Sequence, residues 1–589
     1  MTPAAQSRRA RRAAAMRLAR ELGDRAFDPR ENLVRVSRED IPTARGCLVA
    51  HTSLDYAIAL LETRGKLARA RRIVRRILSL QVRDPRQCGY GNFPFFAHWD
   101  QVHDPNAVCF LTPNLVYIRT RHAARLGPDL CRRLDAAWPL CAYALGRHVV
   151  TRDYSNIFLL SLASKFLLAP LHPHSDLDEE ARGLWQAWLR HTSRYGLVEY
   201  NSPTYLPVCL YALERLWTFG PRDLRAQFGR ALEYLYFELA ARYHAPSGLL
   251  AGAMSRAYPN DLLPGRSHAA LAAHRQWGTP CAPDSPIIVN WLLSGYVAPT
   301  AIRRIALRKR LPLAIRADVE HLGISRTDHL ARDFTLGSQT GRPCHIQEMA
   351  VLATVRSAAA ALAVVCEPSF RQAARLMSCQ RAATVLGIYT YDPVTVRYYY
   401  LGRNVRPAGA LPAALAFEWR LGARDQVREV RANGVKWDGR ALAMEGEAAV
   451  AVDYGRASLG LRVTNRSDNP RERPAPMRLE WGDGGLALRV PVAEAATVAQ
   501  GGEAGAMVFY LRLAGGSGAA CRRMADHLRR VAMQRAGTRA GAAWTASGAE
   551  GRLQVTSPAT PVVHDSPLAR IGPDDLLDFF VGRAPAPWA

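Results

Sequence analysis

The residue types best suited to acid–base chemistry gather in one stretch, Glu199-Tyr200-Asn201-Ser202-Pro203-Thr204-Tyr205, which holds a carboxylate, an amide and two phenols. Ser202 suits the N-cap of a helix and Pro203 its first position, so Tyr205 falls in the first helical turn. The free N–H groups and the positive dipole end at a helix start favour a bound anion. The stretch predicts a site for an anionic ligand; a helix cap with ordinary loop packing is the alternative.

The helix that carries this stretch is expected over residues 203–218, with a partner helix over 222–243. Its apolar residues recur at helical spacing and define one buried face. They are Leu206, Cys209, Leu210, Leu213, Leu216 and Trp217.

Helix starts of this kind recur at a constant interval. Asp104, Asp153 and Ser202 are successively 49 residues apart, and each precedes an apolar periodic segment. Helical hairpins repeated at this length predict an array of helix pairs, either closed into a ring or open as in a protein-binding solenoid. Alternate helices of such an array run in the same direction and begin at one rim. The side chains expected to converge there are His103, Asp104, Asn106, Asn156, Asn201 and Tyr205.

Two loops flank this array. Residues 89–103 are rich in aromatic and imidazole groups, among them His98 and Trp99. The loop at 249–261 carries Arg256 and Tyr258, which either reach the same rim or belong to an ordinary solvated loop. Further helices are predicted over 46–64, 66–82, 129–147, 178–194 and 284–322.

The second half of the chain has a different pattern. Short alternating runs at 350–355, 383–389, 394–400 and 448–452 predict strands, and turn pairs such as Asn433-Gly434 and Asp483-Gly484 separate later ones. Residues 337–341, with His345 and Gln347, form a polar loop that either completes the site or is a plain hairpin loop. The Gly/Ala-rich segment 535–552 is expected to be a surface loop.

The predicted fold class is therefore α+β with several domains. Residues 1–45 form an arginine-rich segment and first helix, residues 46–325 an (α/α) helical toroid, and residues 326–589 an antiparallel β-sandwich.

Charge narrows the partners. The 589 residues include 78 Lys+Arg against 51 Asp+Glu, a net charge of +27. Such an excess reflects either genome composition or attraction to a polyanion. Because the sequence has no zinc finger, RNA-recognition signature or basic heptad array, an acidic polysaccharide is favoured over nucleic acid.

Cysteines and motifs narrow the chemistry. The 11 cysteines never form C-x-x-C and predict reduced core thiols. No H-E-x-x-H, phosphate-binding glycine loop or nucleophile elbow occurs, so no metal or cofactor is expected. Ser7–Arg20 lacks the apolar region of a secretory signal and no apolar run reaches transmembrane length, which predicts a cytoplasmic protein without a membrane partner.

Helical hairpins followed by a β-sandwich, with E-Y-N-S-P-T-Y opening a helix, resemble the toroid polysaccharide lyases of the heparinase II/III-like and alginate-lyase-like type. Tyr154-Ser155-Asn156-Ile157 and the segment 250–258 also carry the resemblance, which spans about residues 46–400. In these lyases an Asn with a His or Arg neutralises the uronate carboxylate, while Tyr and His act as acid and base. The resemblance implies cleavage of uronate-containing glycans by β-elimination.

The resemblance implies catalytic roles for Tyr205, Asn201, Asn156, His103 and Arg256. Tyr205 would be the acid/base group, and Asn201, Asn156 and Arg256 would hold the uronate carboxylate. No histidine lies clearly inside an inner helix, which leaves the base open. The residues expected to contact the rest of the substrate are His98, Trp99, Asp104, Asn106, Glu199, Tyr200 and Tyr258.

Two other function classes are open. An inverting glycoside hydrolase on an (α/α) toroid needs two carboxylates about 6.5–9.5 Å apart, for which Asp100 or Asp104 with Glu199 are candidates. A non-catalytic glycan binder needs only aromatic surfaces, such as those of Phe95, Trp99 and Tyr200.

Overall fold

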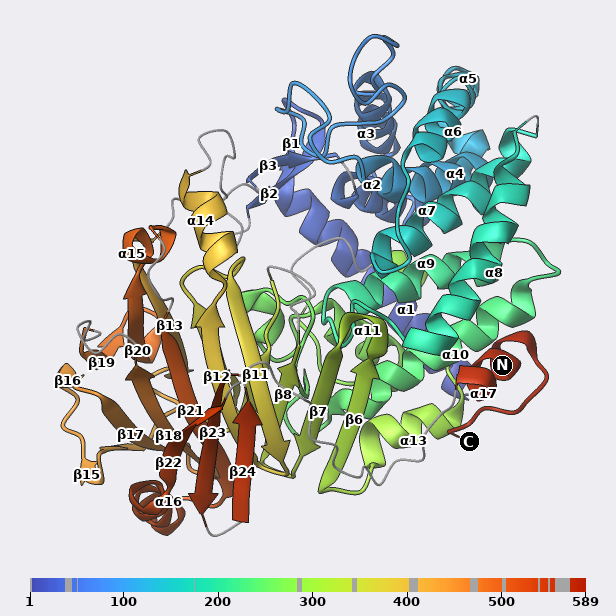
Figure 1. Cartoon of the computed structure of the whole chain (residues 1–589). Helices are drawn as coiled ribbons and strands as arrows, with labels where there is room; N and C mark the ends of the chain where they lie inside the picture. The colour runs from blue at the N-terminus through green and yellow to red at the C-terminus, as the bar shows by residue number, and fades with distance from the viewer. Residues whose placement is uncertain are drawn as a thin grey trace.

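The computed structural model describes residues 3–37, 45–49, 51–173, 175–282, 289–341, 347–401, 412–466, 475–500, 505–538, 541–548, 551–556 and 573–588. A helical region comes first in the chain and antiparallel sheets follow, at the upper right and lower left of Figure 1. The predicted fold class is confirmed. Among the described residues, no helix is both long and apolar enough to cross a membrane.

The helical region is a closed ring. Each inner helix contacts the next, and the last returns to the first, so the ring is not an open solenoid. In ring order the inner helices are α2 (Thr52–Glu62), α4 (Ala107–Leu126), α7 (Ser155–Leu168), α9 (Tyr205–Phe219), α11 (His268–Trp277) and α12 (Val289–Leu292).

A second layer of helices packs outside the ring. It comprises α1 (Pro3–Ala26), α3 (Leu67–Ser79), α5 (Pro128–Asp135), α6 (Trp138–Arg147), α8 (Leu177–Tyr195), α10 (Arg225–Arg242) and α13 (Thr300–Arg308). The sequence accounts for the two layers, because a helix that is apolar all round must be buried all round. Every residue of α7 is buried, whereas in α3 and α8 only one face is.

Three helix predictions need correction. Residues 46–51 are not helical; β3 (Arg45–Leu48) joins β1 (Phe27–Asp28) and β2 (Leu33–Ser37) in a small sheet. The helix expected at 129–147 is divided into α5 and α6. Residues 284–322 are not one helix, because Pro312 forces the residue before it into extended backbone and the strand β6 begins at Leu313.

The sheets form a sandwich whose core lies between two of them. In the described part of the chain, one sheet has nine strands and the facing sheet seven, all paired antiparallel. Buried side chains such as Phe417, Trp419, Leu461 and Phe509 fill the space between them. The predicted strands at 350–355, 383–389 and 448–452 are confirmed as β9, β12 and β17.

The strand bounds follow the order within each sheet. The first sheet runs β16 (Leu442–Met444), β19 (Met477–Gly482), β20 (Gly485–Glu494), β13 (Ala414–Gly422), β10 (Ala361–Pro368), β9 (Val351–Arg356), β8 (Phe334–Thr340), β7 (Ile324–Leu330) and β6 (Leu313–Val319). The second runs β11 (Ala374–Arg381), β12 (Thr384–Tyr391), β21 (Ala506–Gly515), β18 (Ala457–Arg466), β17 (Glu447–Asp453), β14 (Glu429–Ala432) and β15 (Val435–Lys436).

Three predictions in this region are wrong. Residues 394–400 lie in helix α14 (Pro393–Leu401), because Pro393 occupies its first position and Asp392 caps it by accepting a bond from the Val394 N–H at 3.3 Å. Residues 337–341 are not a loop, since strand β8 reaches Thr340; His345 lies outside the described residues.

The third wrong prediction is the surface loop at 535–552. This segment belongs to a sheet of β22 (Ala532–Thr538), β23 (Gly541–Gly548) and β24 (Gly551–Thr556). Its backbone ladder needs no large side chains, and small residues let the sheet pack on β11 and β12, where Ala546 and Leu553 are buried.

The C-terminal segment returns to the helices. Helix α17 (Pro573–Val581) contacts α8 and α10, far from the sheets that precede it (Figure 1). Phe580 packs near the rings of Trp188 and Tyr234, and Arg230 Nε donates to the Phe580 carbonyl at 2.9 Å. The range 326–589 therefore contains more than sheets.

The two regions meet along the segment that follows α10. Met254 pairs with Met349 in an isolated bridge, and Arg242 Nε donates to Asp328 Oδ2 on β7 at 3.0 Å. Arg326, also on β7, lies with its guanidinium carbon 3.8 Å from the centre of the Tyr200 ring. These contacts place the start of α9 directly against the sheets.

The centre of the ring holds a buried polar cluster beside a small cavity. Asn114 and Asn290 donate to Asp55 Oδ1 at 3.2 and 3.0 Å, and Arg215 donates to the amide oxygens of both. Burial raises the pKa of Asp55 to about 8, although Arg215 and the two amides oppose the shift. The cavity is lined by Asn114, Arg215, Asn290, His51, Phe110 and Tyr211, among others.

The contact between the two regions can be tested at Gly252. A Cβ there would lie 2.0 Å from Asp328 Oδ1, and the φ of +94° also disfavours a side chain. We expect Gly252→Ala to cost about 1–3 kcal/mol more than a positive φ alone, through overpacking against the Asp328–Arg242 ion pair. Urea unfolding followed by circular dichroism measures this.

Gly248→Ala is the matched control. Gly248 has a φ of +72°, but a Cβ added there would meet nothing within 4 Å, so this variant isolates the backbone cost. Equal destabilisation of the two variants would contradict tight packing of β7 on the helical region.

Candidate active site

The turn before α9 is held as the sequence predicts, although the helix begins at Tyr205 rather than Pro203. Ser202 Oγ accepts a bond from the Tyr205 N–H at 3.0 Å and donates to the Arg256 carbonyl at 2.6 Å. Asn201 takes a positive φ of 47°, which asparagine tolerates better than most residues. This turn therefore ties the loop that carries Arg256 to the start of α9.

A buried ion pair lies next to this turn. Arg256 Nη1 donates to Glu199 Oε1 at 2.8 Å, and both side chains are 7% exposed. The other oxygen of Glu199 accepts from the backbone N–H of Asn156 at 2.9 Å and from its side-chain amide. Both carboxylate oxygens are thus occupied, and α7, α9 and the 249–258 segment are joined at one point.

Two tyrosines complete the group. Arg256 Nη2 donates to Tyr205 Oη at 2.9 Å, and Tyr205 Oη lies 2.6 Å from Tyr258 Oη. Burial raises the pKa of Tyr205 well above 10, and Tyr258 raises it further, whereas Arg256 opposes the shift. Tyr205 therefore carries its proton at neutral pH, while its ring remains partly exposed.

Arg256 keeps its charge in this setting. Burial alone lowers the pKa of a guanidinium, but Tyr205 and Glu199 outweigh it and the net shift is upward. The result is a permanent positive charge beside a protonated phenol.

Two residues that sequence reasoning left out of the site also contact Arg256. Tyr154 lies with its ring centre 5.7 Å from the guanidinium carbon, and Gln347 Oε1 accepts from Arg256 Nε at 3.1 Å. Burial raises the pKa of Tyr154, and Arg256 lowers it in part. The position of Tyr154, two residues before Asn156, was a usable signal; Gln347 comes from the sheet region and gave none.

The expected convergence at the rim holds for part of the set. Asn156, Glu199, Tyr205, Arg256 and Tyr258 form one connected network. Asn106 reaches it through Tyr154, whose hydroxyl lies 3.4 Å from its side-chain nitrogen, and it also bonds His148 at 2.9 Å.

Asn201 and Tyr200 face elsewhere. The Asn201 amide donates to the carbonyls of Ala251 and Ala253 at 2.7 and 3.0 Å, so it orders the neighbouring loop rather than presenting a donor to a ligand. The Tyr200 ring is buried beneath Arg326 at the contact with the sheets.

The 89–103 loop forms a separate group. Trp99 packs against Phe95 and Phe96, and His103 contacts the Trp99 ring and pairs with the exposed Asp100 at 3.3 Å. His98 lies beside Phe96, and Asp104 caps the Asn106 N–H at 2.9 Å. Within the described residues, no hydrogen bond, ion pair or ring contact joins His98, Trp99 or His103 to Arg256 or Tyr205, so the placing of His103 as base is not supported.

The cysteine prediction is confirmed for the described part of the chain. The nine cysteines found there are all free, and six of them are buried. None takes part in the Arg256 network.

Comparison with known proteins adds little to this geometry. Residues 15–298 match a domain of unknown function (DUF8769). No curated protein matches the chain.

Solved structures resemble it weakly. The chondroitin AC lyase of Streptomyces coelicolor A3, in complex with chondroitin sulphate, is 14% identical over 93% of this chain and 85% of its own, with a TM-score of 0.42. Heparan sulfate lyase HepC from Pedobacter heparinus is 10% identical over 87% and 82%, with a TM-score of 0.31. A heparinase III is 8% identical over 86% and 82%, with a TM-score of 0.36. Scores below 0.5 assign no activity to this chain.

The ion pair predicts a stability effect. Glu199→Gln removes the counter-charge of Arg256 and leaves a buried, uncompensated guanidinium. We expect a loss of about 3–5 kcal/mol in the free energy of unfolding. Urea unfolding at pH 7 measures it.

Asp223→Asn provides the comparison, because it removes an ion pair with Arg182 at the surface. That change is expected to leave stability within experimental error, since exposed pairs contribute little. If the two variants unfold at the same urea concentration, Arg256 does not depend on Glu199.

Proposed function

We propose that this protein is a polysaccharide lyase that cleaves uronate-containing acidic glycans by β-elimination. The observation that carries the proposal is the position of Tyr205 Oη, 2.9 Å from Arg256 Nη2 and 2.6 Å from Tyr258 Oη. A protonated phenol beside a fixed positive charge suits a reaction in which a leaving oxygen needs a proton and an anion needs stabilisation.

The reaction sets the requirements. In β-elimination the proton on C5 leaves, a double bond forms between C4 and C5, and the bond between C4 and O4 breaks. The C5 proton becomes acidic only when the charge on the adjacent carboxylate is offset. A fixed donor at that position is worth roughly 3–4 kcal/mol in comparable sites.

Arg256 is assigned to the carboxylate. A guanidinium has five N–H donors, and the described hydrogen bonds to Glu199, Tyr205 and Gln347 use three of them. Glu199 and Gln347 fix its orientation, and Asn156 fixes Glu199. In this proposal Asn156 and Glu199 position Arg256 instead of contacting the substrate.

The tyrosine pair is assigned to proton transfer. Loss of one proton from the pair leaves a phenolate that the partner hydroxyl and Arg256 stabilise. That phenolate takes the C5 proton, and the partner phenol gives its proton to O4. Proton movement across the 2.6 Å contact between Tyr205 and Tyr258 then restores the pair. The expected partner is an acidic poly- or oligosaccharide, in keeping with the net charge of +27.

The hydrolase alternative lacks support in this network. Its carboxylate, Glu199, has both oxygens engaged, and Asp104 and Asp100 are bound locally to the Asn106 N–H and to His103. An inverting hydrolase needs two available carboxyl groups.

The proposal is tested with Tyr205→Phe on a panel of acidic glycans. The change removes one hydroxyl and should leave folding nearly intact, while kcat falls about 10²–10⁴-fold with a much smaller change in KM. Ultraviolet absorbance of the unsaturated uronate product measures elimination directly. Tyr143→Phe, on the exposed face of α6, is the control and should be fully active.

Several results would contradict the proposal. Cleavage without an unsaturated product would indicate a hydrolase, and so would an inactive Glu199→Gln beside a near-normal Tyr205→Phe. Absence of any product across the panel would leave a glycan-binding role.

The pH dependence gives an independent test. Because burial raises the pKa of Tyr205 well above 10, the pair holds both protons at neutral pH and its singly deprotonated form increases as the pH rises. We expect kcat/KM to rise about tenfold per pH unit between pH 7 and 9. A profile that is flat or falls over this range would exclude the tyrosine pair as the base.

A further inference from the structure

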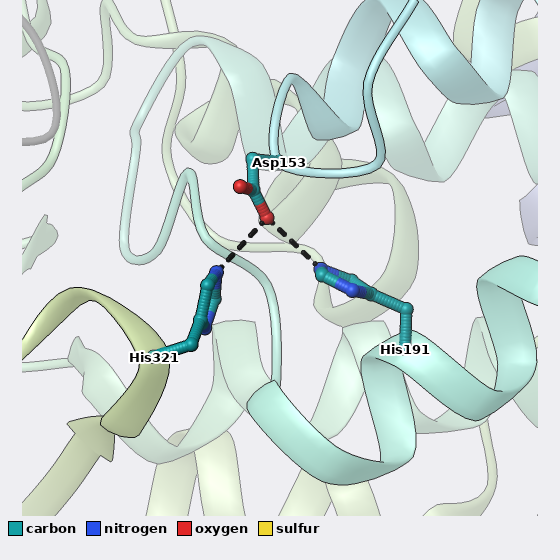
Figure 2. A group of neighbouring side chains, drawn as sticks. All are labelled: Asp153, His191 and His321. Atoms are coloured by element: carbon teal, nitrogen blue, oxygen red, sulfur yellow. Dashed lines mark hydrogen bonds and ion pairs between the residues drawn. The ribbon is translucent and has the colours of Figure 1, made fainter.

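Three side chains that commonly bind metals lie together outside the Arg256 network. Figure 2 shows Asp153, His191 and His321 pointing toward one another. Asp153 precedes α7, His191 lies near the end of α8, and His321 belongs to the short helix η4 (Glu320–Leu322) between β6 and β7. The three are far apart in the sequence, so spacing gave no signal for them.

The distances fit a shared cation. His191 Nε2 and His321 Nε2 lie 3.0 and 3.2 Å from the same atom, Asp153 Oδ1. All the candidate ligand atoms lie within 4.8 Å of one another. Tetrahedral zinc with bonds of about 2.0–2.1 Å places its ligands roughly 3.3 Å apart, close to the two observed separations.

Ordinary hydrogen bonding does not account for the whole group. His191 Nε2 is buried and makes no well-aligned hydrogen bond within the described residues, although it lies 3.0 Å from the carboxylate. Burial lowers the pKa of His191, with Arg152 and His321 adding to the shift and Asp153 opposing it. His191 is therefore a neutral imidazole near pH 7, which is the form that binds metals.

We propose that Asp153, His191 and His321 bind a zinc ion, with its fourth position taken by water. Two imidazoles and one carboxylate form a donor set that zinc accepts, and no thiolate is involved. The proposal does not depend on the activity proposed above.

Such an ion would hold three elements together. It would fix the loop before α7 and the end of α8 to the connection between β6 and β7, across the contact between helices and sheets. Tyr154 and Asn156 directly follow Asp153, so the ion would also fix the backbone that brings both toward Arg256.

The test uses the full-length protein, stripped with a chelator and then titrated with zinc alone. We expect one tightly bound zinc per chain by calorimetry and elemental analysis, and a higher Tm with zinc than without it. His321→Ala should lose at least about 100-fold in affinity, more than the loss typical of a residue outside the ligand set, and its Tm should no longer respond to zinc.

His122→Gln is the matched control. His122 Nε2 lies 3.1 Å from Glu62 Oε1, a comparable partly buried pair without a second imidazole, so this variant should bind zinc as the wild type does. Since His321 lies at the surface, its variant should fold normally; circular dichroism of the metal-free proteins checks this.

Three outcomes would overturn the proposal. The first is a wild type that binds no zinc, and the second is a His321→Ala variant that binds it as tightly as the wild type. The third is a thiolate-to-metal charge-transfer band in the cobalt-substituted protein, which would place the ion on cysteines.

Discussion

The buried ion pair between Arg256 and Glu199 is the interaction on which the arrangement of the candidate site depends. Taking two charges out of water is costly, and the cost is offset only if the remaining donors and acceptors are also satisfied. Here Asn156 occupies the second oxygen of Glu199, while Gln347 and Tyr205 accept from Arg256. Because a displaced member would leave a neighbour unpaired, the phenol of Tyr205 is held at a defined distance from a positive charge.

The same constraint explains why the helices and sheets cannot pack independently. Arg256 is bonded to Gln347 of the sheet region, and Arg242 to Asp328 of β7. Gly337 and Gly252 come so close that a Cβ on Gly337 would lie 2.3 Å from the Gly252 Cα. The site is therefore assembled by both regions, although most of its side chains come from the helices.

Sequence reasoning predicted what is local or periodic. The repeated helix starts placed Asn156 and Tyr205 at one rim, and Ser202 was identified as the residue that holds the first turn of α9. It failed where contacts join distant segments. Nothing near Gln347 indicates that it meets Arg256, and nothing near Asn201 indicates that the carbonyls of the 249–258 loop take up its amide. A run of β-branched and aromatic residues suggested a strand at 394–400, but the proline and capping aspartate before it decided for a helix.

The return of α17 to the helices has a mechanical consequence. The chain leaves the helical region after α13, forms the sheets, and docks again on α8 and α10 (Figure 1). The sheet region is thus anchored at both of its ends, and a hinge about a single linker is not available to it. Any opening of the rim around Tyr205 must come from small sliding of packed elements or from loops such as 89–103. A long glycan would then enter along an edge that is always present, without waiting for the two regions to swing apart.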